Sequence, residues 1–274
     1  MTLTSSARRL DLTKEPGWAP LTGTMEAGAW QVWIWEEPSL PGEITADATL
    51  VAVMDGHLRL AVADPAMTCP DTTDQMAVQA GQTIRSTLRT HLDLDRALDA
   101  AAQHLHDPGR RPRLSNLTAT VAAVDLSLHE QWVHARRAGD AEVWVRSSGG
   151  EWVSLFPASI LTPEARRQFD AHPGADLPGA GALAHWQAHL DVLEDPSQWT
   201  WPPLGFEYPA RIQSKALWPV QELIVATDGA CLTPQRCADL HSWLTSGIQR
   251  APEGHRHPSP HGDIAVLYAS ARGS

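Results

Sequence analysis

The most constraining feature of this sequence is a short apolar run that ends abruptly in a carboxylate. Residues 223–226 read Leu-Ile-Val-Ala and contain no turn former, which is the pattern of a strand buried on both faces of a sheet. Thr227, Asp228 and Gly229 follow directly, so the backbone can turn sharply where the strand leaves the core. Because Asp and Gly also dominate ordinary turns, a simple turn aspartate remains an alternative for this position.

Two further segments repeat the pattern. Residues 58–63 form a second apolar run, which ends in Asp64 and the turn former Pro65. Near the C-terminus, Gly262 and Asp263 open a third apolar run at 264–268. Strands that carry carboxylates at their ends can converge on one oxygen-rich site, and hard cations such as Mg²⁺ or Mn²⁺ prefer such ligands.

The remaining periodicity predicts an α+β fold. Strands are expected at 29–35, 49–54, 58–63, 118–126, 131–137, 142–146, 222–226 and 264–268, and helices at 74–91, 93–106, 163–171 and 234–248. Asp55-Gly56 is the strongest hairpin signal in the chain. The three consecutive strands from 118 to 146 are joined by short turns, which predicts one antiparallel sheet. Because strands and helices come in blocks, we expect antiparallel sheets covered by helices.

The domain organisation is expected to be simple. Residues 1–28 are polar with scattered Pro and Gly, and we expect an N-terminal extension that lies over the surface. Residues 29–274 are expected to form a single domain, since a chain of this length can bury one sizeable core.

Composition limits the partners and the compartment. A net charge of −11 argues against nucleic acid or an anionic membrane as a partner. Cys69, Cys231 and Cys237 lack CxxC spacing, so they predict neither a disulfide framework nor a zinc ribbon. No apolar segment follows Arg8 and Arg9 as in a signal peptide, and no apolar run approaches a membrane span. We therefore expect a soluble cytoplasmic protein.

Taken in order, these motifs resemble those of the PPM-type (type 2C) metal-dependent protein phosphatase family. The similar segments are 60–66 (a strand ending in Asp-Gly in the family), 74–91 (the following helix), 118–124 (a Gly-Thr-Thr-Ala strand), 135–144 (a Gly-Asp-Ser hairpin, here Gly139-Asp140-Ala141), 224–229 (a second Asp-Gly strand) and 262–267 (the final strand). The similarity extends over nearly the whole chain. It implies a sandwich of two antiparallel sheets flanked by helices, with two Mg²⁺ or Mn²⁺ ions between the sheet ends.

The resemblance also implies roles for individual residues. Asp64 would bridge both metals and Asp228 would bind one of them, which makes these two the candidate catalytic residues. Pro65 replaces the family's Gly and would lend its backbone carbonyl to a metal while stiffening the turn. Asp263 is the remaining candidate ligand, and Glu36 would stand for the outer acidic residue of the family's Asn-Glu-Asp segment.

The implied activity is hydrolysis of phosphoserine and phosphothreonine in a phosphorylated protein. Two cations would share a water, lower its pKa and bind the phosphate oxygens while the water attacks in line. Such a reaction needs no covalent enzyme intermediate, so no nucleophilic Ser or Cys is expected.

Two departures from the family pattern support a second hypothesis. Gly262 stands where the family has a ligating Asp, and Asp263 comes one position late, which on a strand turns a side chain to the other face. The family's phosphate-binding Arg has no counterpart, because Gln31, Val32 and Trp33 occupy that neighbourhood. The alternative to an active enzyme is therefore a degenerate pseudophosphatase that binds a phosphopeptide or protein partner. A purely structural role for the aspartates is the third reading.

A histidine-rich loop near the C-terminus is a separate candidate. His255, His257 and His261 lie among prolines and could bind a transition metal. Their spacing is a poor template for a tetrahedral zinc site, although His261 could reach the acidic residues.

Overall fold

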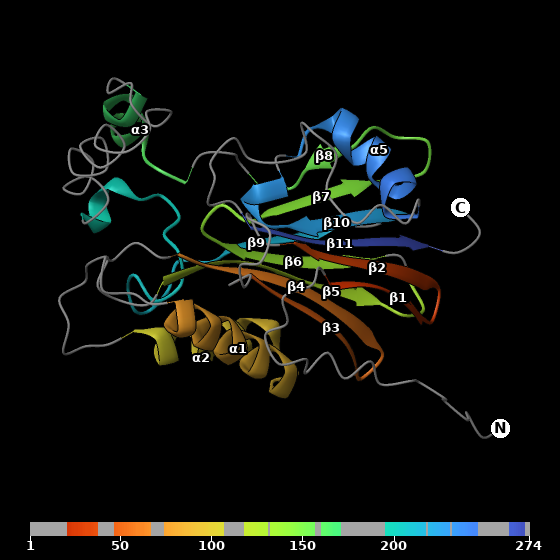
Figure 1. The fold of residues 1–274 in the computed structure, drawn as a ribbon, viewed down its shortest axis with the longest axis horizontal. Coiled ribbons are helices and arrows are strands. Elements are labelled where there is room, and N and C mark those ends of the chain that lie inside the picture. Colours follow the sequence, from red (N-terminus) through yellow and green to blue (C-terminus); the bar gives the residue numbers. More distant parts are fainter. Residues whose placement is uncertain are drawn as a thin grey trace.

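Two antiparallel sheets stacked face to face form the centre of the molecule (Figure 1). The computed structural model describes residues 21–37, 47–66, 74–106, 118–130, 132–156, 160–170, 195–217, 219–230, 232–245 and 263–271. The first sheet contains, in spatial order, β1 (Leu21–Ala27), β2 (Trp30–Glu37), β11 (Ile264–Ala271), β10 (Glu222–Ala226), β7 (Glu142–Arg146) and β8 (Val153–Ser154). The second contains β3 (Ala48–Met54), β4 (His57–Ala66), β5 (Thr118–Ser127), β6 (Val133–Ala138) and β9 (Gln213–Leu217). The predicted α+β sandwich is confirmed.

Two expectations about the strands are wrong. β5 and β6 pair in the second sheet, whereas β7 pairs with β10 in the first, so residues 118–146 do not form one sheet. The short connection 139–141 instead crosses from one sheet to the other. Turn residues in a sequence signal that the chain changes direction, but they do not tell which sheet the next strand joins. Residues 21–27, expected in the N-terminal extension, form β1 and pair with β2 along their whole length.

The main core lies between the sheets and is built by alternate residues of each strand. Inward-facing positions include Leu58, Leu60 and Val62 on β4, and Leu223 and Val225 on β10. Side chains of a strand alternate between its two faces, so every second residue faces the same side; we call this the parity of a position. A residue just beyond a strand end that continues the inward parity also points between the sheets. Residues of the opposite parity, such as Ala61 and Ala63 on β4, face the helices.

Helices cover the outer faces of both sheets (Figure 1). α1 (Asp74–Thr90) and α2 (Leu94–Leu105) pack on the second sheet through a cluster that includes Ile84, Leu88 and Leu98. α5 (Pro234–Thr245) packs on the first sheet, where Trp243 meets Trp35 with ring centroids 4.9 Å apart. α3 (Pro163–Asp170) lies away from both sheets in this view. No helix of the described residues is long and apolar enough to cross a membrane.

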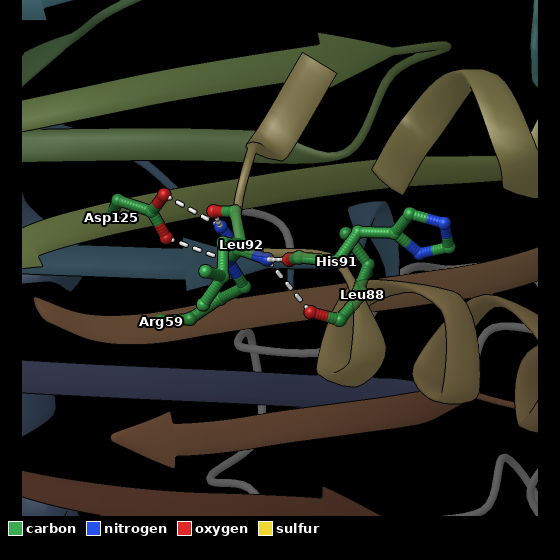
Figure 2. Close-up of polar contacts among 5 residues, drawn as sticks. All are labelled: Arg59, Leu88, His91, Leu92 and Asp125. Atoms are coloured by element: carbon green, nitrogen blue, oxygen red, sulfur yellow. Dashed lines mark hydrogen bonds and ion pairs between the residues drawn. The ribbon is translucent and has the colours of Figure 1, made fainter. Parts of the chain in front are cut away.

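A buried arginine ties the end of α1 to the second sheet (Figure 2). Arg59 is 1 % exposed and binds both carboxylate oxygens of Asp125, at 2.7 and 2.8 Å. Its guanidinium also donates to the backbone carbonyls of Leu88, His91 and Leu92, at 2.8, 2.6 and 2.7 Å. These carbonyls lie at the C-terminal end of α1, where helical carbonyls lack partners of their own and favour a positive charge.

Replacing this arginine is expected to cost much more stability than replacing an exposed one. Arg59→Met leaves Asp125 and the helix-end carbonyls without their donor, so the free energy of unfolding should fall by about 3 kcal/mol. Arg136→Met removes only the ion pair with Asp95 at the surface and should cost less than about 1 kcal/mol. Urea denaturation of both variants measures the difference, and equal losses would contradict this account.

Candidate metal-binding acidic site

Five aspartates meet at one end of the sandwich, and we refer to them as the acidic site. They are Asp47, Asp64, Asp140, Asp228 and Asp263, and each influences the ionisation of at least one other member. They come from both sheets: Asp47 and Asp64 from the second, Asp228 and Asp263 from the first, and Asp140 from the connection between them. Asp64 and Asp228, the two residues singled out from the sequence, are therefore neighbours in space.

The register of the β3–β4 hairpin places Asp47 beside Asp64. Ala48 pairs with Ala63, so the next position outward on each strand brings the two aspartates opposite each other. Both continue the inward parity of their strands, and their carboxyl groups share a hydrogen bond. Asp47 was not predicted as a site residue. The sequence did carry the signal, because the two-residue turn Asp55-Gly56 fixes this register.

A hydrogen bond of Asp47 also links the two sheets. The Thr227 hydroxyl donates to Oδ2 of Asp47 at 2.8 Å. The same hydroxyl oxygen accepts from the backbone N–H of Ala265 at 3.0 Å. Thr227 directly precedes Asp228, so the end of β10 is held against β11 on one side and against Asp47 on the other.

Asp140 enters the site from the crossing between β6 and β7. Gly139 precedes it with a φ of +77°, and a Cβ built there would lie 2.6 Å from Cγ2 of Thr120. Only glycine tolerates both the backbone conformation and this close approach to β5. The Gly139-Asp140-Ala141 segment resembles a family motif, but Asp140 was not predicted as a site residue.

Asp263 also belongs to the acidic site, although it comes one residue after the position at which the family has its aspartate. It has the parity of Ala265 and Leu267, which face the core between the sheets, and its charge contributes to the raised pKa of Asp47 and of Asp64. The inference that a shift of one residue turns Asp263 to the other face is therefore wrong. The direction of the Asp263 side chain is set by which residues of β11 face the core, and a comparison of sequence motifs does not give this. Gly262 and the histidine-rich loop lie outside the described residues.

Glu36 and Pro65, the two other predicted metal residues, occupy different surroundings. Glu36 is buried on β2, and its Oε1 accepts from the backbone N–H of Thr49 at 2.9 Å and from the Thr49 hydroxyl. Burial raises the pKa of Glu36. Asp47, not Glu36, is the acidic residue next to Asp64. Pro65 lies within β4, opposite Ala119 of β5, so the strand continues past Asp64 instead of turning there.

Burial and repulsion by neighbouring carboxylates raise the pKa of three members of the acidic site, Asp47, Asp64 and Asp140. Burial raises the pKa of Asp64 to about 8, with further contributions from the charges of Asp228 and Asp140. Burial raises the pKa of Asp140 to about 7, again with a contribution from Asp228. The pKa of Asp47 lies well above its usual value for the same reasons, with Asp64 and Asp263 as the charged neighbours. Like charges held this close are expensive unless protons or cations separate them.

The donor set fits a hard divalent cation by its chemistry. All five side chains offer carboxylate oxygens, which Mg²⁺ and Mn²⁺ prefer, and a cation would remove the repulsion that otherwise retains protons here. In the part of the chain that the structure describes, no three His, Cys, Asp or Glu side chains already have the arrangement of a formed metal site.

The raised pKa of Asp64 predicts how stability depends on pH in the absence of divalent cations. The carboxyl binds a proton more tightly in the folded state (about 8) than in the unfolded state (3.8), so rising pH between these values destabilises the fold. Asp64→Asn removes this titration, and its stability relative to wild type should increase by about 3–4 kcal/mol from pH 5 to pH 8. Urea denaturation in EDTA measures this difference, and a difference that stays constant with pH would contradict it.

Comparison with known proteins identifies the fold. No protein-family model and no curated protein sequence matches this chain. Among solved structures, RsbX in complex with magnesium superposes with a TM-score of 0.59 at 12% identity, covering 92% of this chain and all of RsbX. The S. agalactiae serine/threonine phosphatase gives a TM-score of 0.58 at 12% identity, covering 89% of this chain and all of that one.

A third structure, serine-threonine phosphatase 2C from Toxoplasma gondii, gives a TM-score of 0.53 at 12% identity and covers 93% of this chain and all of its own. At such identities the likeness concerns the fold, and it agrees with the resemblance seen in the sequence motifs. This chain has the two-sheet α+β fold of the PPM-type (type 2C) serine/threonine phosphatases.

Proposed function

We propose that this chain is a metal-dependent phosphatase that hydrolyses phosphoserine or phosphothreonine in a protein substrate. The observation that carries the proposal is the convergence of five aspartates from both sheets at one end of a phosphatase-like sandwich. A structural role alone does not account for it, because grouped carboxylates destabilise a fold that leaves them without cations.

Four of the five aspartates have a defined part in this proposal. Asp64 lies centrally, since the four other members all affect its ionisation, and it is our candidate for the ligand shared by two cations. Asp47 is held in place by Thr227, and Asp140 by the Gly139 crossing. Asp228 is exposed, so it lies where a substrate would approach. A bound Mg²⁺ or Mn²⁺ pair would lower the pKa of a water molecule and withdraw charge from the phosphate oxygens.

The charge of the protein makes cations necessary for a phosphorylated substrate. With a net charge of −11 and an acidic site, the chain repels a phosphate group unless positive charge is added. Divalent cations among the aspartates would supply that charge at the point of reaction. A phosphorylated protein or peptide is therefore the expected partner, and nucleic acid is not.

A catalytically degenerate binding module is the second candidate. It is favoured by Gly262, which replaces a carboxylate of the family pattern, and by the absence of a formed three-ligand arrangement among the described residues. Such a module would bind a phosphopeptide or protein partner without turnover.

Hydrolysis of p-nitrophenyl phosphate with and without Mn²⁺ separates the two candidates. We expect Mn²⁺-dependent turnover in the wild type and at least a ~100-fold loss of kcat in Asp64→Asn and in Asp228→Asn, because each removes a proposed ligand. Asp95→Asn is a matched control, since Asp95 pairs with Arg136 at the surface and should leave the rate unchanged.

A wild-type protein without turnover that still binds a phosphopeptide would favour the module. Turnover that survives both Asp64→Asn and Asp228→Asn would rule out the acidic site as the catalytic centre.

A further inference from the structure

A second buried arginine lies between the sheets, close to Asp140 of the acidic site. Arg137 is at the end of β6, has the inward parity of Val133 and Ala135, and is 2 % exposed. It pairs with Ala122 of β5, two positions deeper along the strands than Thr120 and Gly139. Its side chain therefore enters the space between the sheets next to the crossing that carries Asp140.

The surroundings of Arg137 differ from those of Arg59. The Arg137 guanidinium carbon lies 5.1 Å from the ring centroid of Phe156, which carries no formal charge. On β9, Gln213 is opposite Arg137 and 5 % exposed, and within the described part of the chain its amide makes no hydrogen bond. Gln213 thus does not hold the guanidinium from that side.

Asp140 of the acidic site and Glu142 of β7 both contribute negative charge near Arg137. Burial lowers the pKa of Arg137 to about 10, while the charges of Asp140 and Glu142 raise it. Arg137 in turn helps Asp140 to stay ionised. The ion pair of Arg59 with Asp125 lies on the opposite face of the same sheet.

We propose that Arg137 is a built-in counterion of the acidic site, which balances part of the aspartate charge in the metal-free protein and thereby weakens the binding of divalent cations. This inference rests on the proposed function. Arg137 acts through Asp140 and its neighbours and is a positioning residue, not a catalytic one.

Coulomb's law gives the direction in which Arg137 changes the affinity for cations. A fixed positive charge stabilises the metal-free carboxylates and repels an incoming Mg²⁺ or Mn²⁺ ion, so both effects lower the affinity. The interaction is screened little because Arg137 is buried. Removing the charge should therefore tighten cation binding, the opposite of what damage to the site would do.

Calorimetric titration with Mn²⁺ tests the proposal. Arg137→Met and Arg137→Gln should each lower the Kd by about tenfold, whereas Arg137→Lys, which keeps the charge, should stay within about threefold of wild type. Arg136→Met is the matched control: it removes the neighbouring charge on the opposite face of β6, where Arg136 pairs with Asp95, and should leave the Kd unchanged. An unchanged or higher Kd in both uncharged Arg137 variants would overturn the inference.

A measurement without metal keeps this test separate from the proposed function. In EDTA, a double-mutant cycle of Arg137→Gln and Asp140→Asn should show a favourable coupling between the two residues in urea denaturation. No coupling would overturn the counterion role. If neither wild type nor any variant binds Mn²⁺, the proposed function fails together with the affinity effect. If wild type binds Mn²⁺ and the uncharged variants match it, the proposed function stands and only this inference fails.

Discussion

Repulsion between inward-facing carboxylates is the constraint on which the arrangement of this molecule depends. A sandwich core normally continues with apolar side chains to the last pair of each strand, as Leu58, Leu60 and Val62 do along β4. At one end the same parity instead presents aspartates from both sheets. The energetic cost appears in the raised pKa of Asp64 and Asp140. The apolar core beneath, the Gly139 crossing and the Thr227 hydrogen bond hold these groups together against that repulsion.

The sequence was sufficient for the fold class and for three of the five acidic residues, Asp64, Asp228 and Asp263. Apolar runs that end in Asp64 and Asp228 are local patterns, and the buried strands they predict are present as β4 and β10. Asp47 could also have been found, because the Asp55-Gly56 turn sets it opposite Asp64. Glu36 was predicted because its position matches the acidic residue of the family's Asn-Glu-Asp segment, but it lies on β2 of the other sheet.

Other features depend on tertiary structure and had no local signal. Whether β7 continues the sheet of β6 or joins the opposite one is decided by how the two sheets pack, and short turns are compatible with both. The role of Gly139 follows from its distance to Thr120 on another strand. Arg137 lies between the sheets, whereas Arg136 faces the helices. Which of the two faces inward depends on how β6 packs against its neighbouring strands, and the sequence alone does not show this.

The two buried arginines of the second sheet show how the same residue type serves different ends. Arg59 has a bidentate carboxylate and three carbonyl acceptors, so its charge is satisfied locally and it secures a helix to the sheet. Arg137 lies against an aromatic ring and next to an excess of carboxylates. Arg59 therefore contributes mainly to the stability of the fold. Arg137 contributes mainly to the electrostatic field at the end of the sandwich.

The hydrogen bond between Thr227 and Asp47 joins β10 of one sheet to the residue that begins β3 of the other. If a cation binds to the acidic site as proposed, its ligands would come from both layers and the cation would cross-link them. Separation of the layers would then have to break the coordination shell before the interior could hydrate, so occupancy acts on the rate of opening as well as on the equilibrium. Deuterium uptake by the amides of β4 and β10 should become slower together, although these strands belong to different layers.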